Sequence, residues 1–193
     1  MEDPSHDDVH CMERLREGDD LALNYLMGRW KEPLVSFCFR YTGNLADALE
    51  IVQETIIKVY GSRHRYRPKA AFSTWLFTIA VNLCKMRARW KSRHPEILEA
   101  DGGSKVGQQA SSAGMDGTDP GIETDRNALA NDLDHAIQSL PHELRVAFVL
   151  FEMEGHSYRE VAAVLKCTEK AVERRLARAR EDLRSILEPK WRN

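Results

Sequence analysis

Five arginines cluster near the C-terminal end of this chain, and their spacing poses the first chemical question. They lie within 165-LKCTEKAVERRLARAREDLR-184, a stretch with helical periodicity, in a chain of 193 residues whose formal net charge is −2. Exposed guanidinium groups bind phosphates, so a basic strip in a slightly acidic chain favours contact with a polyanion such as DNA. The alternative is an ordinary solvated helix whose acids and bases pair along its own surface.

The strip needs elements that hold it outward, and the preceding residues predict them. Ser157 and Glu160 have the spacing of a capping box, which starts a short helix that ends at Leu165. Thr168 then caps a longer helix after a short turn, and this order is the helix-turn-helix arrangement. Apolar stripes at matching spacing allow the two helices to pack: Tyr158, Val161, Ala162, Leu165, Val172, Leu176, Ala179 and Leu183.

The first turns of the longer helix carry the predicted contacts with duplex DNA. A helix fits the major groove, and its N-terminal residues reach the base edges. The predicted base-edge contacts are Thr168, Glu169, Lys170, Glu173 and Arg174, and the predicted phosphate contacts are Arg175 and Arg178. Phosphate contacts position a protein on DNA without specifying a sequence.

A second basic zone lies in the other half of the chain. Residues 61–95 hold nine Lys and Arg and no Asp or Glu, whereas residues 96–140 hold two against nine. Such charge asymmetry is typical of nucleic-acid binding. The zone contains three residues spaced to share a helical face, Asn82, Lys85 and Arg89, and two cations predicted to widen it, Arg87 and Lys91.

Cations and aromatic residues alternate just upstream of that face. The predicted nucleic-acid contacts in this segment are Arg63, Arg65, Tyr66, Arg67, Lys69, Phe72 and Trp75. The combination suits single-stranded or melted DNA, because phosphates meet the cations and unstacked bases meet the rings. The spacing of Phe72 and Trp75 equally allows both to be core residues, and the sequence leaves these alternatives open.

The chain divides into two helical parts around a polar segment. The stretch 101-DGGSKVGQQASSAGMDGTDPG-121 has almost no large apolar residue, so it predicts a flexible linker. We expect an all-α protein with two small helical domains, at residues 1–95 and 125–193, joined by a linker at 96–124. No stretch shows the alternation that is typical of a β-strand.

Three local features of the N-terminal part bear on its structure. Asn44 is a good N-cap for the helix that follows, and Pro33 is placed to kink or divide the helical run before it. His6, His10 and Cys11 have the ligand types of a loose metal site, but the acidic first residues favour an unstructured tail.

Several classes of function lack support in the sequence. There is no GxSxG, P-loop or HExxH motif and no pair of carboxylates spaced for catalysis, so we expect no enzymatic activity, no cofactor and no metal. No apolar run is long enough to span a bilayer and no secretory signal begins the chain, so we expect a cytoplasmic protein without membrane insertion. The four cysteines lack a CxxC pair and are expected to be reduced.

Three blocks of the sequence together resemble one protein family. They are 44-NLADALEIVQETIIKVY-60, 72-FSTWLFTIAVNL-83 and 139-SLPHELRVAFVLFEMEGHSYREVAAVLKCTEKAVERRLARAREDLR-184. In order and spacing they are similar to the bacterial extracytoplasmic-function (ECF) sigma factors, which are detachable subunits of RNA polymerase. The resemblance implies a factor that directs promoter-specific, DNA-templated transcription initiation and carries no chemistry of its own.

The resemblance also implies a role for each block. The first domain resembles sigma region two, and its loop at 63–71 and helix at 72–91 match the part that reads and opens the minus-ten element. The C-terminal domain resembles region four, which reads the minus-thirty-five element. The implied docking surface for core RNA polymerase consists of Asp47, Glu50, Gln53 and Glu54.

Partners and departures complete what the resemblance implies. A dedicated anti-sigma factor would hold the two domains together and mask both DNA faces. The chain lacks a coiled-coil heptad, so we expect it to be monomeric when free. Lys166 stands where the family often has Gly, Glu173 where it often has Lys, and Met86 where it often has Asp. These three positions leave the promoter sequence open.

A stand-alone helix-turn-helix regulator is the alternative reading. Such proteins usually dimerise and bind paired half-sites. The second basic zone has no use in a simple repressor, and this favours the sigma-factor interpretation.

Overall fold

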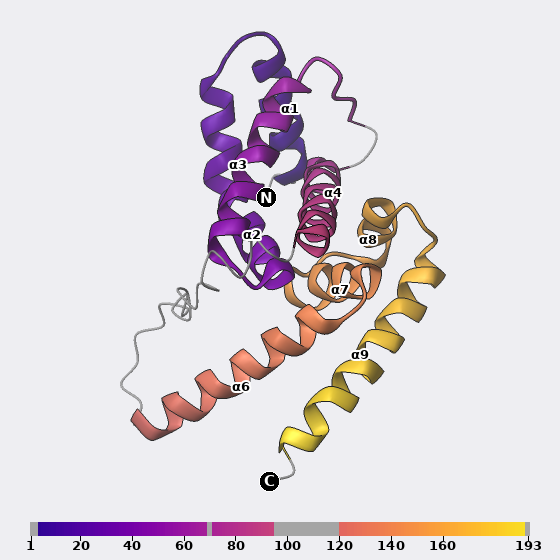
Figure 1. The fold of residues 1–193 in the computed structure, drawn as a ribbon. Helices are drawn as coiled ribbons and strands as arrows, with labels where there is room; N and C mark the ends of the chain where they lie inside the picture. Colours follow the sequence, from indigo (N-terminus) through magenta and orange to yellow (C-terminus); the bar gives the residue numbers. More distant parts are fainter. Residues whose placement is uncertain (1–3, 69–70, 95–119, 192–193) are drawn as a thin grey trace.

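The computed structural model describes residues 4–68, 71–94 and 120–191, with side chains described for 7–68, 71–94 and 129–189. All regular structure in these ranges is helical, which confirms the all-α expectation. The elements, shown in Figure 1, are α1 (Pro4–Arg16), α2 (Leu21–Thr42), α3 (Leu45–Gly61), α4 (Phe72–Arg93), α6 (Pro120–Ser139), α7 (His142–Phe148), the π-helical turn η1 (Val149–Met153), α8 (Tyr158–Leu165) and α9 (Glu169–Trp191).

Helix α2 is the central element of the N-terminal domain and runs without a break through Pro33. An internal proline costs a helix about 3 kcal/mol, because it removes a hydrogen bond and crowds the preceding turn. The residues that follow, Leu34, Phe37 and Cys38, are completely buried. Their packing holds the helix together, so the expected division at Pro33 does not occur.

Aromatic rings fill the centre of this domain. Phe77 lies edge-on to Phe37 with ring centroids 5.5 Å apart. The ring centroid of Trp30 lies 6.3 Å from that of Phe77 and 6.3 Å from that of Phe72. Edge-to-face arrangements match the positive ring edge to the negative face of its neighbour. The core therefore joins α2 to α4, the helix that carries the second basic zone.

The expectation of an unstructured N-terminal tail is wrong, because its residues form α1. Cys11, Met12 and Leu15 are buried between α1 and the rest of the domain. Asp8 accepts hydrogen bonds from Trp30 Nε1 and Arg29 Nη1, both at 3.2 Å, and these tie α1 to α2. The short apolar stripe was hidden by the acidic residues around it. Among the described residues, no group of His, Cys, Asp or Glu is arranged to hold a metal ion.

The C-terminal domain is built around α9. Its Val172, Leu176 and Ala179 are completely buried, as are Ile137 of α6 and Leu150 of η1. Helix α6 begins at Pro120, inside the range predicted as linker, so the C-terminal helical part starts earlier than expected. The predicted linker residues before it, up to 119, lie outside the described residues.

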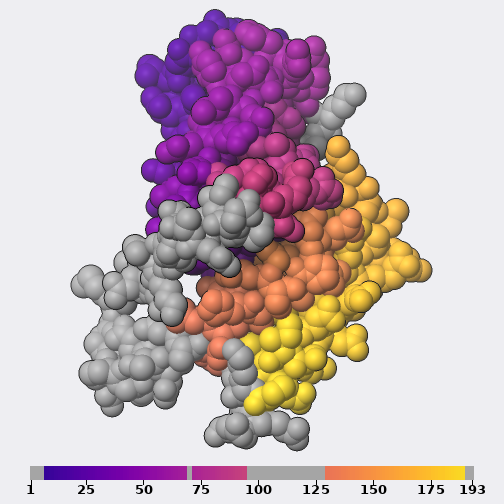
Figure 2. Space-filling model, viewed as in Figure 1, coloured from indigo at the N-terminus to yellow at the C-terminus, as the bar shows by residue number. Residues whose placement is uncertain are grey.

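The two domains lie against each other in this structure (Figures 1 and 2). Helix α2 contacts α6 and η1, and α4 contacts α8. Gly43, at the end of α2, has φ 69°, and a Cβ on it would lie 2.2 Å from the Gln138 side chain. Only glycine permits both this backbone conformation and this close approach.

Polar contacts cross the domain interface between residues far apart in the chain. Ser36 Oγ donates a hydrogen bond of 2.7 Å to Glu154, and Arg145 donates one of 2.8 Å to the carbonyl oxygen of Tyr41. The Tyr41 hydroxyl and His142 Nδ1 share a hydrogen bond of 2.7 Å. Burial raises the pKa of Tyr41 to about 12, and burial together with Lys85 lowers the pKa of His142 to about 4. The interface therefore favours the neutral forms of both side chains.

Candidate nucleic-acid interface

Helices α8 and α9 form the predicted helix-turn-helix. The capping box of Ser157 and Glu160 is present in full, with both reciprocal hydrogen bonds. Thr168 Oγ1 accepts from the backbone N–H of Ala171 at 3.2 Å and so caps α9. Lys166 has φ 52° at the end of α8, a left-handed conformation that costs a residue other than glycine about 1 kcal/mol. Local sequence signals therefore set the start of each helix, whereas the turn between them forms against the preference of its lysine.

The first turns of α9 present a polar face to solvent. The residues on it are exposed and lie opposite the buried apolar stripe: Thr168, Glu169, Lys170, Glu173, Arg174 and Arg178. No described residue forms an ion pair with Arg174 or Arg178. This face has the shape and the free cations that a major groove requires.

Two other arginines of α9 are held by the domain itself. Arg175 donates to Cys167 Sγ at 2.7 Å and forms an ion pair with Glu143 of α7. Arg180 Nε donates to Glu152 of η1 at 2.9 Å. The predicted role of Arg175 as a phosphate contact stays a prediction, and in this structure the side chain is already paired within the domain. Its guanidinium group fastens α9 to α7 and to the turn before it.

Asn82, Lys85 and Arg89 lie along one face of α4, as their spacing predicted. Asn82 and Arg89 are exposed and Lys85 is half-buried. Lys85 and Arg89 line a cleft of about 570 Å³ that also touches Tyr41 and His142 at the domain interface. The cationic face of α4 thus lies beside the C-terminal domain in this structure.

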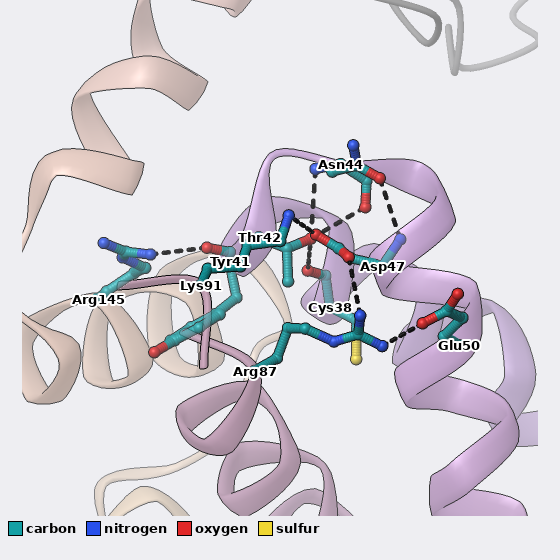
Figure 3. A network of polar contacts seen from close by, with 9 residues as sticks. All are labelled: Cys38, Tyr41, Thr42, Asn44, Asp47, Glu50, Arg87, Lys91 and Arg145. Atoms are coloured by element: carbon teal, nitrogen blue, oxygen red, sulfur yellow. Dashed lines mark hydrogen bonds and ion pairs between the residues drawn. The ribbon is translucent and has the colours of Figure 1, made fainter. Parts of the chain in front are cut away.

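Arg87 and Lys91 do not widen that face, which corrects the prediction. Both point to the other side of α4, toward the first turn of α3 (Figure 3). Arg87 forms ion pairs with Asp47, at 3.4 Å, and with Glu50, and Lys91 forms one with Asp47. Residues two apart lie on nearly opposite sides of a helix, so cations at 85, 87, 89 and 91 divide between two faces.

The loop before α4 contributes fewer candidate contacts than its composition predicted. Phe72 is completely buried and Tyr66 is 7% exposed, so neither ring is available for base stacking, and both belong to the core. Trp75 is half-buried, with its ring centroid 4.9 Å from that of Tyr66. The open alternative is thus decided as core for Phe72, whereas Trp75 keeps an exposed part.

The cations of this loop differ in their freedom. Arg63 lies over the Tyr60 ring, 4.1 Å from its centroid, and also donates to the Tyr60 carbonyl oxygen. Arg67 donates to the carbonyl oxygens of His64 and Tyr66 and is exposed. Arg65 is exposed and has no ion-pair partner among the described side chains. Lys69 lies outside the described residues.

The outward face of α3 was predicted as a docking surface, and its four residues separate into two groups. Glu50, Gln53 and Glu54 are exposed, but only 11% of the Asp47 side chain is, because Arg87 and Lys91 cover it. Sequence reasoning missed Leu49 and Ile57, which are 41% and 69% exposed on the same helix. They lie four residues to either side of Gln53, and this apolar spacing on an outward face was the available signal.

Two family models and several known relatives match this chain. The family model "Sigma-70 region 2" matches residues 26–94, and "Sigma-70, region 4" matches residues 130–183. The ECF RNA polymerase sigma-E factor of Escherichia coli K12 is 33% identical over 182 residues, covering 94% of this chain and 95% of that protein. The chain belongs to the ECF RNA polymerase sigma factors. The RNA polymerase sigma-H factor of Pseudomonas aeruginosa is 30% identical over the same length, with 94% of each chain covered.

Solved structures show the same fold as this sigma factor. CnrH in complex with the cytosolic domain of CnrY matches with a TM-score of 0.68 and 23% identity, covering 95% of this chain and 98% of that one. The sigma factor RpoE in complex with the anti-sigma factor NepR from Bartonella quintana matches with a TM-score of 0.62 and 22% identity, covering 86% and 96%. At this level of identity the likeness concerns the fold alone.

Membership of the family assigns this sigma factor its general task, promoter-specific initiation of transcription with RNA polymerase. The region 2 match contains α3 and α4, and the region 4 match contains α8 and most of α9. None of the helices in the described part of the chain combines the length and the apolar character needed to cross a membrane.

Proposed function

We propose that this sigma factor reads two promoter elements with two helix faces and docks on core RNA polymerase with a third. The first turns of α9 read the minus-thirty-five duplex, the Asn82 face of α4 reads the minus-ten element and assists its opening, and α3 binds polymerase. The observation that carries the proposal is the distribution of cations. On α9 the unpaired cations lie on one exposed face, and on α4 they lie on one face beside the domain interface, whereas the other cations described for these helices pair with acids of the same domain.

For the upstream duplex, Arg174 and Glu173 are the informative side chains. Arg174 is exposed within the first two turns of α9, where a guanidinium group reaches guanine N7 and O6. Glu173 is also exposed, and a carboxylate at that position accepts a hydrogen bond from a cytosine amine. Arg178 lies one turn further along and is placed for a phosphate.

For the downstream element, the exposed residues of α4 and the preceding loop suit a melted strand. Lys85, Arg89 and Arg65 supply positive charge for phosphates, and Asn82 supplies an amide for a base edge. The exposed part of Trp75 is the remaining aromatic surface in this segment. Base contacts by Phe72 and Tyr66 form no part of the proposal, because both rings are buried.

The position of the α4 face implies that the domains separate before promoter binding. Lys85 and Arg89 line a cleft that His142 of the C-terminal domain also lines. DNA that entered this cleft to contact both cations would meet the C-terminal domain at His142. We therefore assign the docked arrangement to the free factor. A partner of the anti-sigma class, as in the RpoE–NepR complex, would act by holding the domains in this arrangement.

Run-off transcription tests the proposed function. Core polymerase with the purified chain and a library of promoter-like duplexes is expected to start transcription at specific sites that core polymerase alone does not use. Absence of both core binding and new start sites contradicts the proposal. Tight, saturable binding to duplex DNA without polymerase would instead favour a stand-alone regulator.

A further inference from the structure

The C-terminal half of α4 projects beyond the hydrophobic core. Cys84 is the last buried residue of this helix, and every described residue after it, up to Arg93, is half-buried or exposed. Arg89, one of the proposed promoter contacts, lies in this projecting part. Hydrophobic packing therefore does not fix the direction in which Arg89 points, and other contacts have to do so.

Ion pairs to α3 hold the projecting part of α4 from one side (Figure 3). Arg87 bridges Asp47 and Glu50, and Lys91 binds the other oxygen of Asp47 one turn further along. Asp47 is itself fixed, because its backbone N–H donates to Asn44 Oδ1 at 3.0 Å and its carboxylate lies in the first turn of α3. A carboxylate in the first turn of a helix is stabilised by the positive end of the helix dipole. The acids thus form a rigid anchor for the cations of α4.

The two carboxylates differ in what else they can contact. The Asp47 side chain is 11% exposed and is enclosed by its two cations, whereas Glu50 is 61% exposed. Glu50 lies one turn before Glu54 on the outward face of α3, the proposed polymerase-docking surface. The Glu50 carboxylate therefore belongs both to the proposed docking surface and to the ion pairs that hold the proposed promoter-reading helix.

We propose that Asp47, Glu50 and Arg87 are positioning residues for promoter opening. They hold the projecting end of α4, with Arg89 on its far side, at the angle that meets the minus-ten element. Because Glu50 also faces polymerase, docking on α3 acts directly on this anchor and couples polymerase binding to the placement of α4. The inference rests on the proposed roles of α3 and α4.

The energetics separate this role from an ordinary structural one. Partly exposed ion pairs contribute little to folding stability. Breaking one is expected to lower the melting temperature of the N-terminal domain by no more than about 8 °C. A displacement of about 1 Å in a positioned group can cost far more than this in rate. A large loss of promoter opening with a small loss of stability is therefore the signature of positioning.

Three variants of the full chain and the conservative variant Arg87→Lys, each with core polymerase, test the proposal. Arg87→Gln removes the bridge, Glu50→Gln removes the shared carboxylate, and Glu54→Gln is the matched control. Glu54 lies on the same exposed face, but its ion pair, at 3.4 Å, is with Lys58 of its own helix. For each variant we would measure core affinity by fluorescence anisotropy and promoter opening, at saturating core, by permanganate reactivity of the minus-ten thymines.

The expected results differ for each variant. Arg87→Gln keeps core affinity and reduces opening about tenfold or more, with partial recovery in Arg87→Lys, which keeps the charge but not the two-pronged geometry. Glu54→Gln reduces core affinity and leaves opening at saturating core unchanged. Glu50→Gln reduces both quantities. Melting curves of the free variants confirm that each remains folded.

Two outcomes would overturn the proposal. One is normal opening by Arg87→Gln at saturating core, and the other is a defect in Arg87→Gln confined to core affinity, as in the control. Failure of the proposed function is distinguishable, because the wild-type chain would then not bind core polymerase at all.

Discussion

The two basic helices, α4 and α9, both divide their cations between exposed and paired positions, but the acids that pair with them lie on different kinds of element. Each has some cations that are exposed and others that pair with acids of its own domain. On α9 those acids are Glu143 and Glu152, which lie on α7 and η1 of the compact C-terminal bundle. On α4 they are Asp47 and Glu50 of α3, whose outward face is the proposed site of polymerase docking.

The two faces proposed to read DNA also differ in how exposed they are. The first turns of α9 are exposed, whereas Lys85 and Arg89 of α4 line a cleft at the domain interface. Under the proposed function, the upstream face is accessible in the free chain, whereas the downstream face depends on domain separation and on its ion pairs to α3.

The first prediction concerns folding stability and the first residue of each basic helix. Phe72, the first residue of α4, is completely buried, whereas Glu169, the first residue of α9, is exposed. Phe72→Ala is expected to cost about 3–5 kcal/mol of unfolding free energy, because it leaves a cavity in the core. Chemical denaturation checks this. A loss of promoter melting with unchanged stability would show that Phe72 contacts bases instead.

The second prediction compares a free and a paired arginine within α9. Arg174→Ala is expected to weaken promoter binding by about 1–3 kcal/mol and to relax discrimination at one upstream base pair. Arg180→Ala is the matched control, since Arg180 is paired with Glu152 and should change promoter affinity much less. Holoenzyme binding to promoter duplexes with single substitutions measures both. Equal losses in the two variants would contradict the assignment of the reading face.

The third prediction concerns the interface that covers the α4 face. The pKa of His142 is lowered to about 4 in the docked arrangement, from an ordinary value of 6.5, so docking favours the neutral imidazole. Titration of His142 therefore leaves the association of the two domains unaffected above pH 6.5 and weakens it as the pH falls from 6.5 toward 4. Small-angle X-ray scattering should show an increase in radius of gyration between about pH 7.5 and about pH 5.5.

The variant His142→Gln separates this group from its neighbours. Burial also lowers the pKa of His156 and raises that of Glu154 at the same interface, and these two act in opposite directions on acidification. The expansion should be smaller in His142→Gln than in the wild-type chain. An identical expansion in both would assign the pH response to other groups.

The smallest expected effect lies in the turn that sets α9 against α8. Lys166→Gly is expected to raise the stability of the C-terminal domain by up to about 1 kcal/mol, because Lys166 has a left-handed backbone with φ 52°. Gly155→Ala should do the reverse, since Gly155 has φ 72° and open space around it. Thermal unfolding measures both shifts, and promoter affinity should not change. Destabilisation by Lys166→Gly, or stabilisation by Gly155→Ala, would show that backbone strain at these turns is not what their φ values indicate.

Local signals in the sequence predicted much of this structure correctly. The capping residues Asn44, Ser157 and Thr168, and the apolar periodicity around them, predicted helices that the structure confirms. The order and spacing of three sequence blocks predicted the family, which the comparisons confirm. These signals are readable because each depends on residues within one or two helical turns of one another.

Most of the errors concern contacts between distant segments, although the separation of Arg87 and Lys91 from the Lys85 face follows from helical periodicity alone. The burial of α1, the continuity of α2 through Pro33 and the pairing of Arg87 with Asp47 depend on residues about 20 to 40 positions away. The exposure of a cation is likewise decided by where the acids of other helices lie. A count of charges along one helix cannot show this.

Capping and apolar periodicity are local properties, and they were enough to predict an all-α chain of two helical domains and the helix-turn-helix that starts at Ser157. The resemblance of three sequence blocks predicted the family. Which cations are free depends on contacts between helices. Arg174 is next to Arg175 in the sequence, and Arg89 is two residues from Arg87. Arg175 and Arg87 nevertheless point toward acids of neighbouring helices and pair with them, whereas Arg174 and Arg89 do not. Packing between helices therefore divides the cations of two similar basic strips into exposed ones and ones that pair within the fold.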